Sequence, residues 1–131
     1  MAQTMMSDRE FMSVMRAVMT TGRSCVERGW TQHVAARDAN GMEVNDIDDV
    51  AVEFCITGAV GLAAHQHYID HRVGEWTLRV AALDRLKEAG AILPSESLHD
   101  WNDDSSRTKE QVLALFDKAL AAIPEEPEEG E

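Results

Sequence analysis

The apolar run from Val50 to Ala64 constrains the fold more than any other part of this sequence, because only Glu53 and Thr57 in it are neither small nor apolar. A segment of this kind must be covered on all sides by the rest of the chain. Its length favours one buried helix, but the apolar alternation from Val50 to Ile56 is also typical of a strand. We therefore expect a central, mostly helical element, and whether its first residues form helix or strand stays open.

Two capped helices are expected near the two ends of the chain. Ser7 and Glu10 have the spacing of a capping box, in which the serine oxygen accepts one free backbone N–H and the glutamate reaches back to another. Apolar residues then recur at helical spacing as far as Gly29, a good stop signal. Thr108 and Gln111 repeat the box ahead of the last helix. These signals predict where both helices begin.

A third, amphipathic helix is expected over residues 75–89, ended by Gly90. Its predicted apolar stripe comprises Trp76, Val80, Leu83 and Leu86, with Leu78 and Ala82 beside it. The segment 91–107 that follows is predicted to be a connecting loop, packed on the core through its apolar residues.

Residues 30–44 are expected to form a short β-hairpin or an extended segment. The sequence Asp-Ala-Asn-Gly at residues 38–41 is a turn signal, because Asn-Gly suits positive φ, and residues 42–44 would return as a second strand. An EF-hand calcium loop is excluded, because its glycine would have to occupy the position of Glu43.

Three glycines fall on apolar faces of these helices, at Gly22, Gly58 and Gly61. Glycine costs about 1 kcal/mol of helix propensity against alanine. We therefore expect each of them to let a neighbouring element approach the helix backbone closely.

Together the elements predict one compact, mainly α domain over residues 1–123, with about four major helices and a short β-hairpin or extended segment after the first. A chain of 131 residues suits one domain. Residues 124–131 are predicted to be a disordered acidic tail. The expected core comprises Phe11, Val18, Phe54, Val60, Leu83, Leu113 and Phe116.

The net charge limits the kinds of molecule that this protein is expected to bind. A formal net charge of -12 repels phosphate backbones, so direct nucleic-acid binding is not expected. Such a surface suits a basic protein partner or simple solubility.

The two cysteines form no CxxC pair and are expected to be reduced thiols. Because no apolar stretch reaches the ~18 residues of a membrane span, we expect a soluble, cytoplasmic protein without a membrane partner.

Several short motifs occur in a fixed order: "ERGW", "ARDANG", "FCITGAVGLAA", "HDWND" and "RTKEQVLALFDKAL". In this pattern, from Val14 to Ala122, the chain resembles a family of small uncharacterised proteins from actinobacteria and their phages, known only as a domain of unknown function. The matching positions are Gly29, Trp30, Cys55, Gly58, Ala59, Trp101, Asn102, Asp103 and Arg107. The resemblance implies a mostly helical fold and brings no activity, ligand or catalytic residue. The His65–His71 stretch and the tail lie outside the pattern.

Cys55 is a candidate nucleophile, because it lies near the start of the central helix, where a thiolate would be stabilised. The same residue sits in an apolar run, which raises a thiol pKa and makes the group inert. Because no signature of cysteine catalysis accompanies it, a buried packing cysteine is the favoured interpretation.

Metal and cofactor sites are not expected. His67 and His71 are weak candidates for zinc, because residues four apart share one helix face, but HExxH is absent. A solvent-facing helix end is favoured for them. An oxygen-rich stretch comprises Asn45, Asp46, Asp48 and Asp49. These residues are interpreted as caps and loop acids rather than cation ligands.

The best candidate site is Trp101-Asn102-Asp103. Thr108 already caps the last helix, so these residues are not needed for that task. In one interpretation Trp101 anchors a loop that the Asn102 and Asp103 side chains lock through backbone N–H groups. In the other, Asn102 and Asp103 face a ligand or partner beside Trp30.

Two functions follow from these alternatives. The favoured one is a non-enzymatic, small acidic accessory or interaction protein, encoded by a phage or mobile element, that binds another protein. Such a chain could also associate with itself. The alternative is a small-ligand binder or enzyme with a cleft near Trp30, Cys55 and residues 101–103. The partner, the ligand and the biological process do not follow from the sequence.

Overall fold

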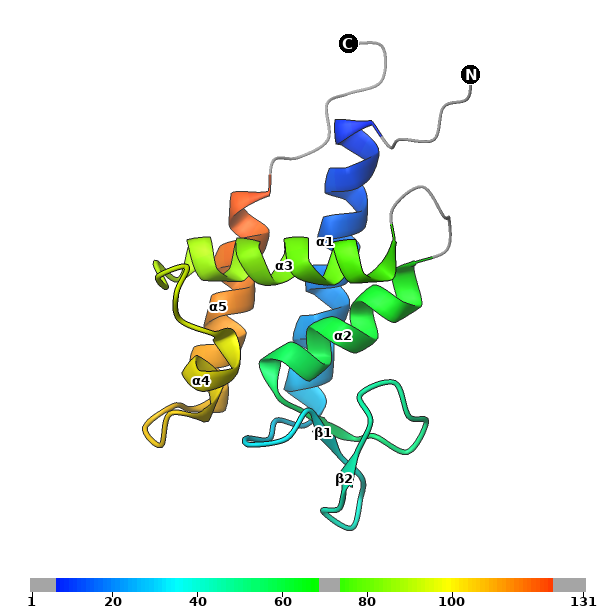
Figure 1. Cartoon of the computed structure of the whole chain (residues 1–131), viewed down its shortest axis with the longest axis vertical. Helices are drawn as coiled ribbons and strands as arrows, with labels where there is room; N and C mark the ends of the chain where they lie inside the picture. The colour runs from blue at the N-terminus through cyan, green and yellow to red at the C-terminus, as the bar shows by residue number, and fades with distance from the viewer. Residues whose placement is uncertain (1–6, 69–73, 124–131) are drawn as a thin grey trace.

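The computed structural model describes residues 7–68 and 74–123, and this part of the chain forms a mainly helical, compact domain with a small antiparallel sheet after the first helix (Figure 1). The helices are α1 (Asp8–Arg28), α2 (Ile56–His67), α3 (Glu75–Ala89), α4 (Leu98–Asp103) and α5 (Lys109–Ala122). The strands are β1 (Ala36–Arg37), β2 (Glu43–Val44) and β3 (Glu53–Phe54). The predicted fold class is confirmed. The expected tail, 124–131, lies outside the described residues.

The two predicted capping boxes are present. The Ser7 hydroxyl oxygen accepts the Glu10 N–H at 3.1 Å, and the Glu10 carboxylate accepts the Ser7 N–H at 2.9 Å. Thr108 and Gln111 make the same reciprocal pair at the start of α5. Gly29 ends α1, and its N–H donates to the Cys25 carbonyl. These local signals therefore act as the sequence indicates.

Helix α2 is the central element, but it begins at Ile56 and not at Val50. It packs against α1, α3 and α4, while Val50 and Val52 lie exposed in the loop before β3. The expectation of helix is wrong for the first part of the apolar run, and the strand alternative holds for Glu53 and Phe54 only. The reason is backbone pairing: the Phe54 N–H donates to the Gly29 carbonyl, and its own carbonyl accepts the Thr31 N–H.

The hairpin expected after α1 is present as β1 and β2, and β3 joins its other side in the order β2-β1-β3. The turn is closed by Asp38, whose side chain accepts the N–H groups of Asn40 and Met42. Gly41 there has a φ of 81°, as the Asn-Gly signal predicts. The sheet lies at the opposite end of the molecule from the start of α1 and the end of α5 (Figure 1).

Close approach at the three predicted glycines is confirmed. A Cβ on Gly22 would lie 2.9 Å from the Phe116 ring, so this glycine lets α5 pack on α1. A Cβ on Gly58 would overlap the carbonyl oxygen of Ala35. At Gly61 it would overlap the carboxylate of Asp46. The segment that carries β1 and the loop after β2 therefore both rest directly on the α2 backbone.

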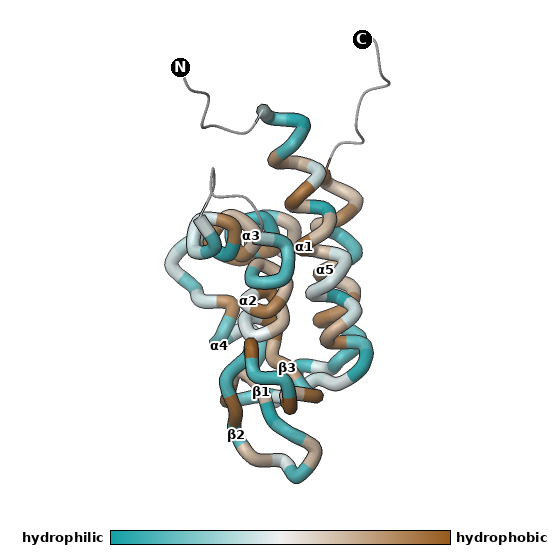
Figure 2. The backbone as a smooth tube through the Cα atoms, turned by 90° about the vertical axis from the view of Figure 1, so that its right-hand side faces the viewer, coloured by the Kyte–Doolittle hydropathy of each residue, from teal (hydrophilic) through white to brown (hydrophobic). Residues whose placement is uncertain are grey.

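The core is aliphatic and centred on α1, α2 and α5. Of the expected core residues, Val18, Phe54, Val60 and Phe116 are buried. The others, Phe11, Leu83 and Leu113, are partly buried and pack at the edge of the core. Figure 2 shows hydrophobic and hydrophilic residues close together along the chain around the sheet, where Ala36 and Phe54 belong to the core. No helix in the two described ranges is long and apolar enough to cross a membrane.

The predicted stripe of α3 is wrong for two of its members. Trp76 and Val80 are 70% and 37% exposed, whereas Leu78, Ala82 and Leu86 are the buried residues of this helix. The buried positions are spaced by four and so share one face. Apolar residues occur around most of this helix, so its contacts with α2 and α5 determine which face is buried.

The segment 91–107 is not only a loop, because it contains α4. Ser97 caps this short helix by accepting the Asp100 N–H at 3.0 Å. Trp101, Asn102 and Asp103 are therefore helical residues in the last turn of α4, and the loop expectation is wrong for them.

We expect Gly58→Ala to lower the free energy of unfolding by about 1–3 kcal/mol, the usual cost of overpacking, even though alanine gains about 1 kcal/mol of helix propensity. The added methyl group would overlap the Ala35 carbonyl, which is rigid backbone. Urea denaturation measures the change. In the matched variant Gly74→Ala, no described atom lies within 4 Å of the new Cβ, and a change below about 1 kcal/mol is expected. A Gly58→Ala protein as stable as wild type would contradict this account of the packing.

Candidate functional site

The side chain of Asn102 joins three parts of the chain at one point. It is fully buried, and its amide oxygen accepts both the Trp30 indole N–H at 2.8 Å and the Ile56 backbone N–H at 3.0 Å. Its amide nitrogen donates to the Thr31 carbonyl at 3.2 Å and to the Asp103 carboxylate at 3.1 Å. Two accepted and two donated bonds use the full capacity of a primary amide. We call this group of contacts the Asn102 junction.

Asp103 extends the junction to the segment before β1. Its Oδ1 accepts the His33 N–H at 2.8 Å, and its Oδ2 lies 3.2 Å from His99 Nε2 and 3.8 Å from His33 Nδ1. His33 has a φ of 77°, a left-handed conformation that L residues seldom adopt. The carboxylate therefore stabilises a strained position of the chain.

The pKa of the Asp103 carboxyl is lowered. Burial alone would raise it, but hydrogen bonds from the His33 N–H and the Asn102 amide, together with the charges of His99 and His33, outweigh burial. The native fold thus favours the ionised form of this group.

Gln32 and Arg107 hold the end of α4 from two sides. The Gln32 amide nitrogen donates to the carbonyls of Asn102 and Asp104, both at 2.9 Å. Arg107 donates to the Trp101 carbonyl at 2.9 Å, and its guanidinium carbon lies 3.8 Å from the centre of the Trp101 ring. These bonds satisfy carbonyls that the end of a helix leaves free, and the stacked Trp101 ring packs against the core.

Cys55 lies beside the junction but is enclosed. Its Sγ accepts the Gly58 N–H at 3.3 Å and lies 3.0 Å from the Thr57 hydroxyl, so the residue serves as the N-cap of α2. The side chain is fully buried. The other thiol, Cys25, is also buried, and burial raises its pKa. Both groups are placed for packing, whereas a nucleophile needs access and a nearby base.

Of the two candidate zinc ligands, the structure describes only His67, and its imidazole already has a partner. His67 Nε2 lies 2.7 Å from the Thr21 hydroxyl, and His71 lies outside the described residues. In residues 7–68 and 74–123, no three His, Cys, Asp or Glu side chains are grouped to hold a metal ion.

The oxygen-rich stretch at residues 45–49 serves its own loop. Asn45 and Asp48 accept the N–H groups of Ile47 and Val50, at 3.1 Å each. The buried Asp46 carboxylate lies 3.3 Å from an Arg79 nitrogen, and this contact holds the loop against α2 and α3.

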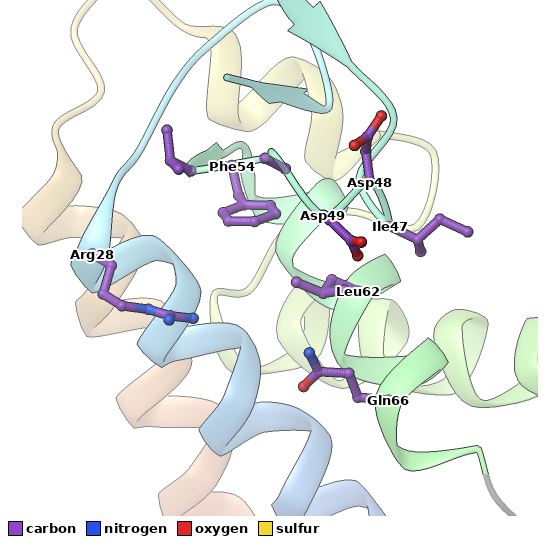
Figure 3. Close-up of a pocket in the computed structure, with 9 residues that line it drawn as sticks. Arg28, Ile47, Asp48, Asp49, Phe54, Leu62 and Gln66 are labelled. Atoms are coloured by element: carbon purple, nitrogen blue, oxygen red, sulfur yellow. The ribbon is translucent and has the colours of Figure 1, made fainter. Parts of the chain in front are cut away.

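The sequence did not indicate the hollow between α1, α2 and the loop before β3 (Figure 3). It has a volume of about 390 Å³ and is lined by Arg28, Ile47, Asp48, Asp49, Ala51, Val52, Phe54, Leu62 and Gln66. Arg28 and Asp49 direct their charged ends into it from opposite sides (Figure 3). The hollow was missed because the apolar run predicts a buried helix or strand at Val50 and Val52 rather than an exposed loop. The charged pair Asp48-Asp49 ahead of them was the available signal for a loop.

Beside the hollow lies an unusual concentration of exposed apolar side chains. Seven large apolar residues are exposed in the described chain, and four of these lie in residues 42–52: Met42, Ile47, Val50 and Val52. Three exposed acids lie among them: Glu43, Asp48 and Asp49. We call these seven residues the 42–52 surface.

A protein-family model covers most of the chain. The model of a family of unknown function (DUF6197) matches residues 10–122. No curated protein and no solved structure matches the chain.

We expect the stability that Asp103 contributes to depend on pH. Its pKa is lower in the folded chain than the value of about 3.9 in an unfolded chain. The carboxylate therefore stabilises the fold fully above that value, and this contribution disappears as the pH falls through the lower folded pKa. The measurement is the difference in unfolding free energy between wild type and Asp103→Asn, from pH 7 to pH 3.

Asp84→Asn, which removes an exposed carboxylate from α3, is the matched control for that measurement. A difference between wild type and Asp103→Asn that stays constant down to pH 3 would contradict the role given to the charge.

Proposed function

The chain belongs to the DUF6197 family, whose function is unknown, and from the geometry of the chain itself we propose that it is a non-enzymatic interaction protein that binds a basic partner protein. The observation that carries the proposal is the 42–52 surface. There, exposed aliphatic side chains and exposed carboxylates share one short segment.

Apolar exposure supports a protein partner. Single exposed apolar residues are normal on any protein, but a contiguous patch rimmed by polar groups is typical of an interaction surface. Ile47 illustrates the arrangement, because it borders the hollow of Figure 3 and a second, more open hollow of about 640 Å³ that Glu43 and Glu75 also line. A partner that covers Ile47 would therefore bury surface on both of its sides.

Charge supports a basic partner. The formal net charge of -12 produces a negative potential that attracts cations and repels phosphate backbones. Glu43, Asp48 and Asp49 bring that charge next to the exposed apolar groups. Long-range attraction would raise the association rate, and the apolar contacts would hold the complex together.

The contacts at the candidate cleft support a non-enzymatic role. The polar atoms of Asn102 are bonded within the chain, and the Cys55 sulfur caps a helix. An enzyme with its active site here would have to present the Asn102 amide and the Cys55 thiol to a substrate, whereas both are engaged within the chain.

The proposal includes the setting of the interaction. Following the resemblance to actinobacterial and phage proteins, the chain would be encoded by a phage or mobile element and would meet its partner in the host cytoplasm.

The test is quantitative capture of host proteins by the full chain. The surface variant Ile47→Ser/Val50→Ser/Val52→Ser should capture the partner at least about tenfold less well, a loss of about 1.4 kcal/mol. Capture by wild type should also weaken as salt screens the charges. Direct titration with the purified partner then checks that the two bind without a third component.

The matched control is Leu93→Ser, which removes an apolar side chain that is more exposed than any of the three and lines neither hollow, and it should leave capture unchanged. Equal losses in both variants, or an acidic partner, would overturn the proposal. So would sedimentation of the wild type as a dimer that the surface variant converts to monomer, because a second copy would then occupy the surface.

A further inference from the structure

The hollow beside the 42–52 surface carries a more specific inference, which rests on the proposed function. Leu62 and Phe54 give it an apolar lining, and the side chain of Gln66 from α2 also borders it (Figure 3). Its volume of about 390 Å³ is near the lower end of the range of about 300–1,000 Å³ found for ligand pockets. This space can hold one large apolar side chain with part of its backbone.

The hollow has opposite charges on its two sides. Arg28, in the last turn of α1, directs its guanidinium toward the space, and Asp49 directs its carboxylate toward it from the loop (Figure 3). Within the described part of the chain Arg28 makes no ion pair. Its contacts are long ones, 3.4 Å to the Ser24 carbonyl and 3.7 Å to the Cys25 sulfur. Both charges are therefore available to an incoming group.

Asp48 also borders the hollow, but its carboxylate points away from it (Figure 3). It accepts the Val50 N–H at 3.1 Å, which fixes the loop. A bound group would therefore meet the Asp49 carboxylate on this side and the Arg28 guanidinium on the other.

The rim favours a protein segment over a free small molecule. A small-molecule site encloses most of its ligand, whereas here the exposed apolar side chains of Ile47, Val50 and Val52 continue beyond the hollow. An anchoring side chain in a pocket, surrounded by a broader apolar contact, is the usual arrangement where proteins bind.

We infer that the hollow receives a large aliphatic or aromatic side chain of the partner, and that Arg28 and Asp49 set the direction of the bound segment. The segment would carry an acidic residue on the Arg28 side of its apolar anchor and a lysine or arginine on the other side. Each charge would pair with its opposite across the rim.

The test selects dodecapeptides from a random display library on the immobilised full chain and measures their affinity by fluorescence polarisation. The selected peptides should share one large apolar residue between an acidic and a basic residue. The swapped variant Arg28→Glu/Asp49→Arg keeps the net charge and should bind them at least about tenfold more weakly. Peptides with every charge exchanged should prefer the swapped variant.

A matched swap, Asp84→Lys/Lys118→Glu, exchanges exposed charges on α3 and α5 and should leave peptide binding unchanged. Equal affinity for wild type and the Arg28/Asp49 swap would overturn the inference, as would a failure to enrich any peptide. If peptide binding is unchanged by the Arg28/Asp49 swap but lost in Ile47→Ser/Val50→Ser/Val52→Ser, the proposed function stands and only the directional anchor is removed. If peptide binding is unchanged in both variants, the result counts against the proposed function and against this inference.

Discussion

One buried amide connects the parts of this fold that are far apart in sequence. Asn102 lies in the last turn of α4, yet its side chain binds the indole of Trp30, the carbonyl of Thr31 and the first backbone N–H of α2 at Ile56. Leaving any of these groups unpaired in the interior would cost about 1–3 kcal/mol. Because α2 is the element against which α1, α3 and α4 pack, the Asn102 junction fixes the start of the central helix relative to its neighbours.

This arrangement separates a rigid interior from an exposed recognition segment. Gly61 has no side chain, so the loop after β2 rests directly on α2. In this loop, the Asp46 carboxylate also pairs with Arg79 of α3. The loop is thus held at its start, and it presents Ile47 and Val50 outward. Binding residues on a loop positioned by a rigid scaffold lose little conformational freedom when a partner arrives. The same reasoning connects the junction, whose amide groups are bonded within the chain, with the proposed function of the 42–52 surface.

The sequence predicted what depends on neighbouring residues and missed what depends on distant ones. The capping boxes and the Asp38–Gly41 turn are local chemistry, so they were foreseen. The apolar run predicts a buried helix or strand at Val50 and Val52, because it does not reveal that the chain around Phe54 pairs with a segment some 24 residues earlier. Asn102 was recognised as surplus to helix capping, but its partners lie 46 to 72 residues away. The hollow is formed by α1, α2 and the loop before β3, and the periodicity of apolar residues does not predict that these segments lie together.

The most direct test of the account is native-state hydrogen exchange at the two N–H groups that the Asn102 oxygen accepts. If the Asn102 junction fixes the start of α2, the Trp30 indole N–H and the Ile56 amide N–H should exchange only when the whole domain unfolds. Their opening free energies would then equal those of amides in the middle of α2, such as Val60. Exchange of either group orders of magnitude faster than Val60, through a local opening, would contradict the claim that the fold depends on this junction.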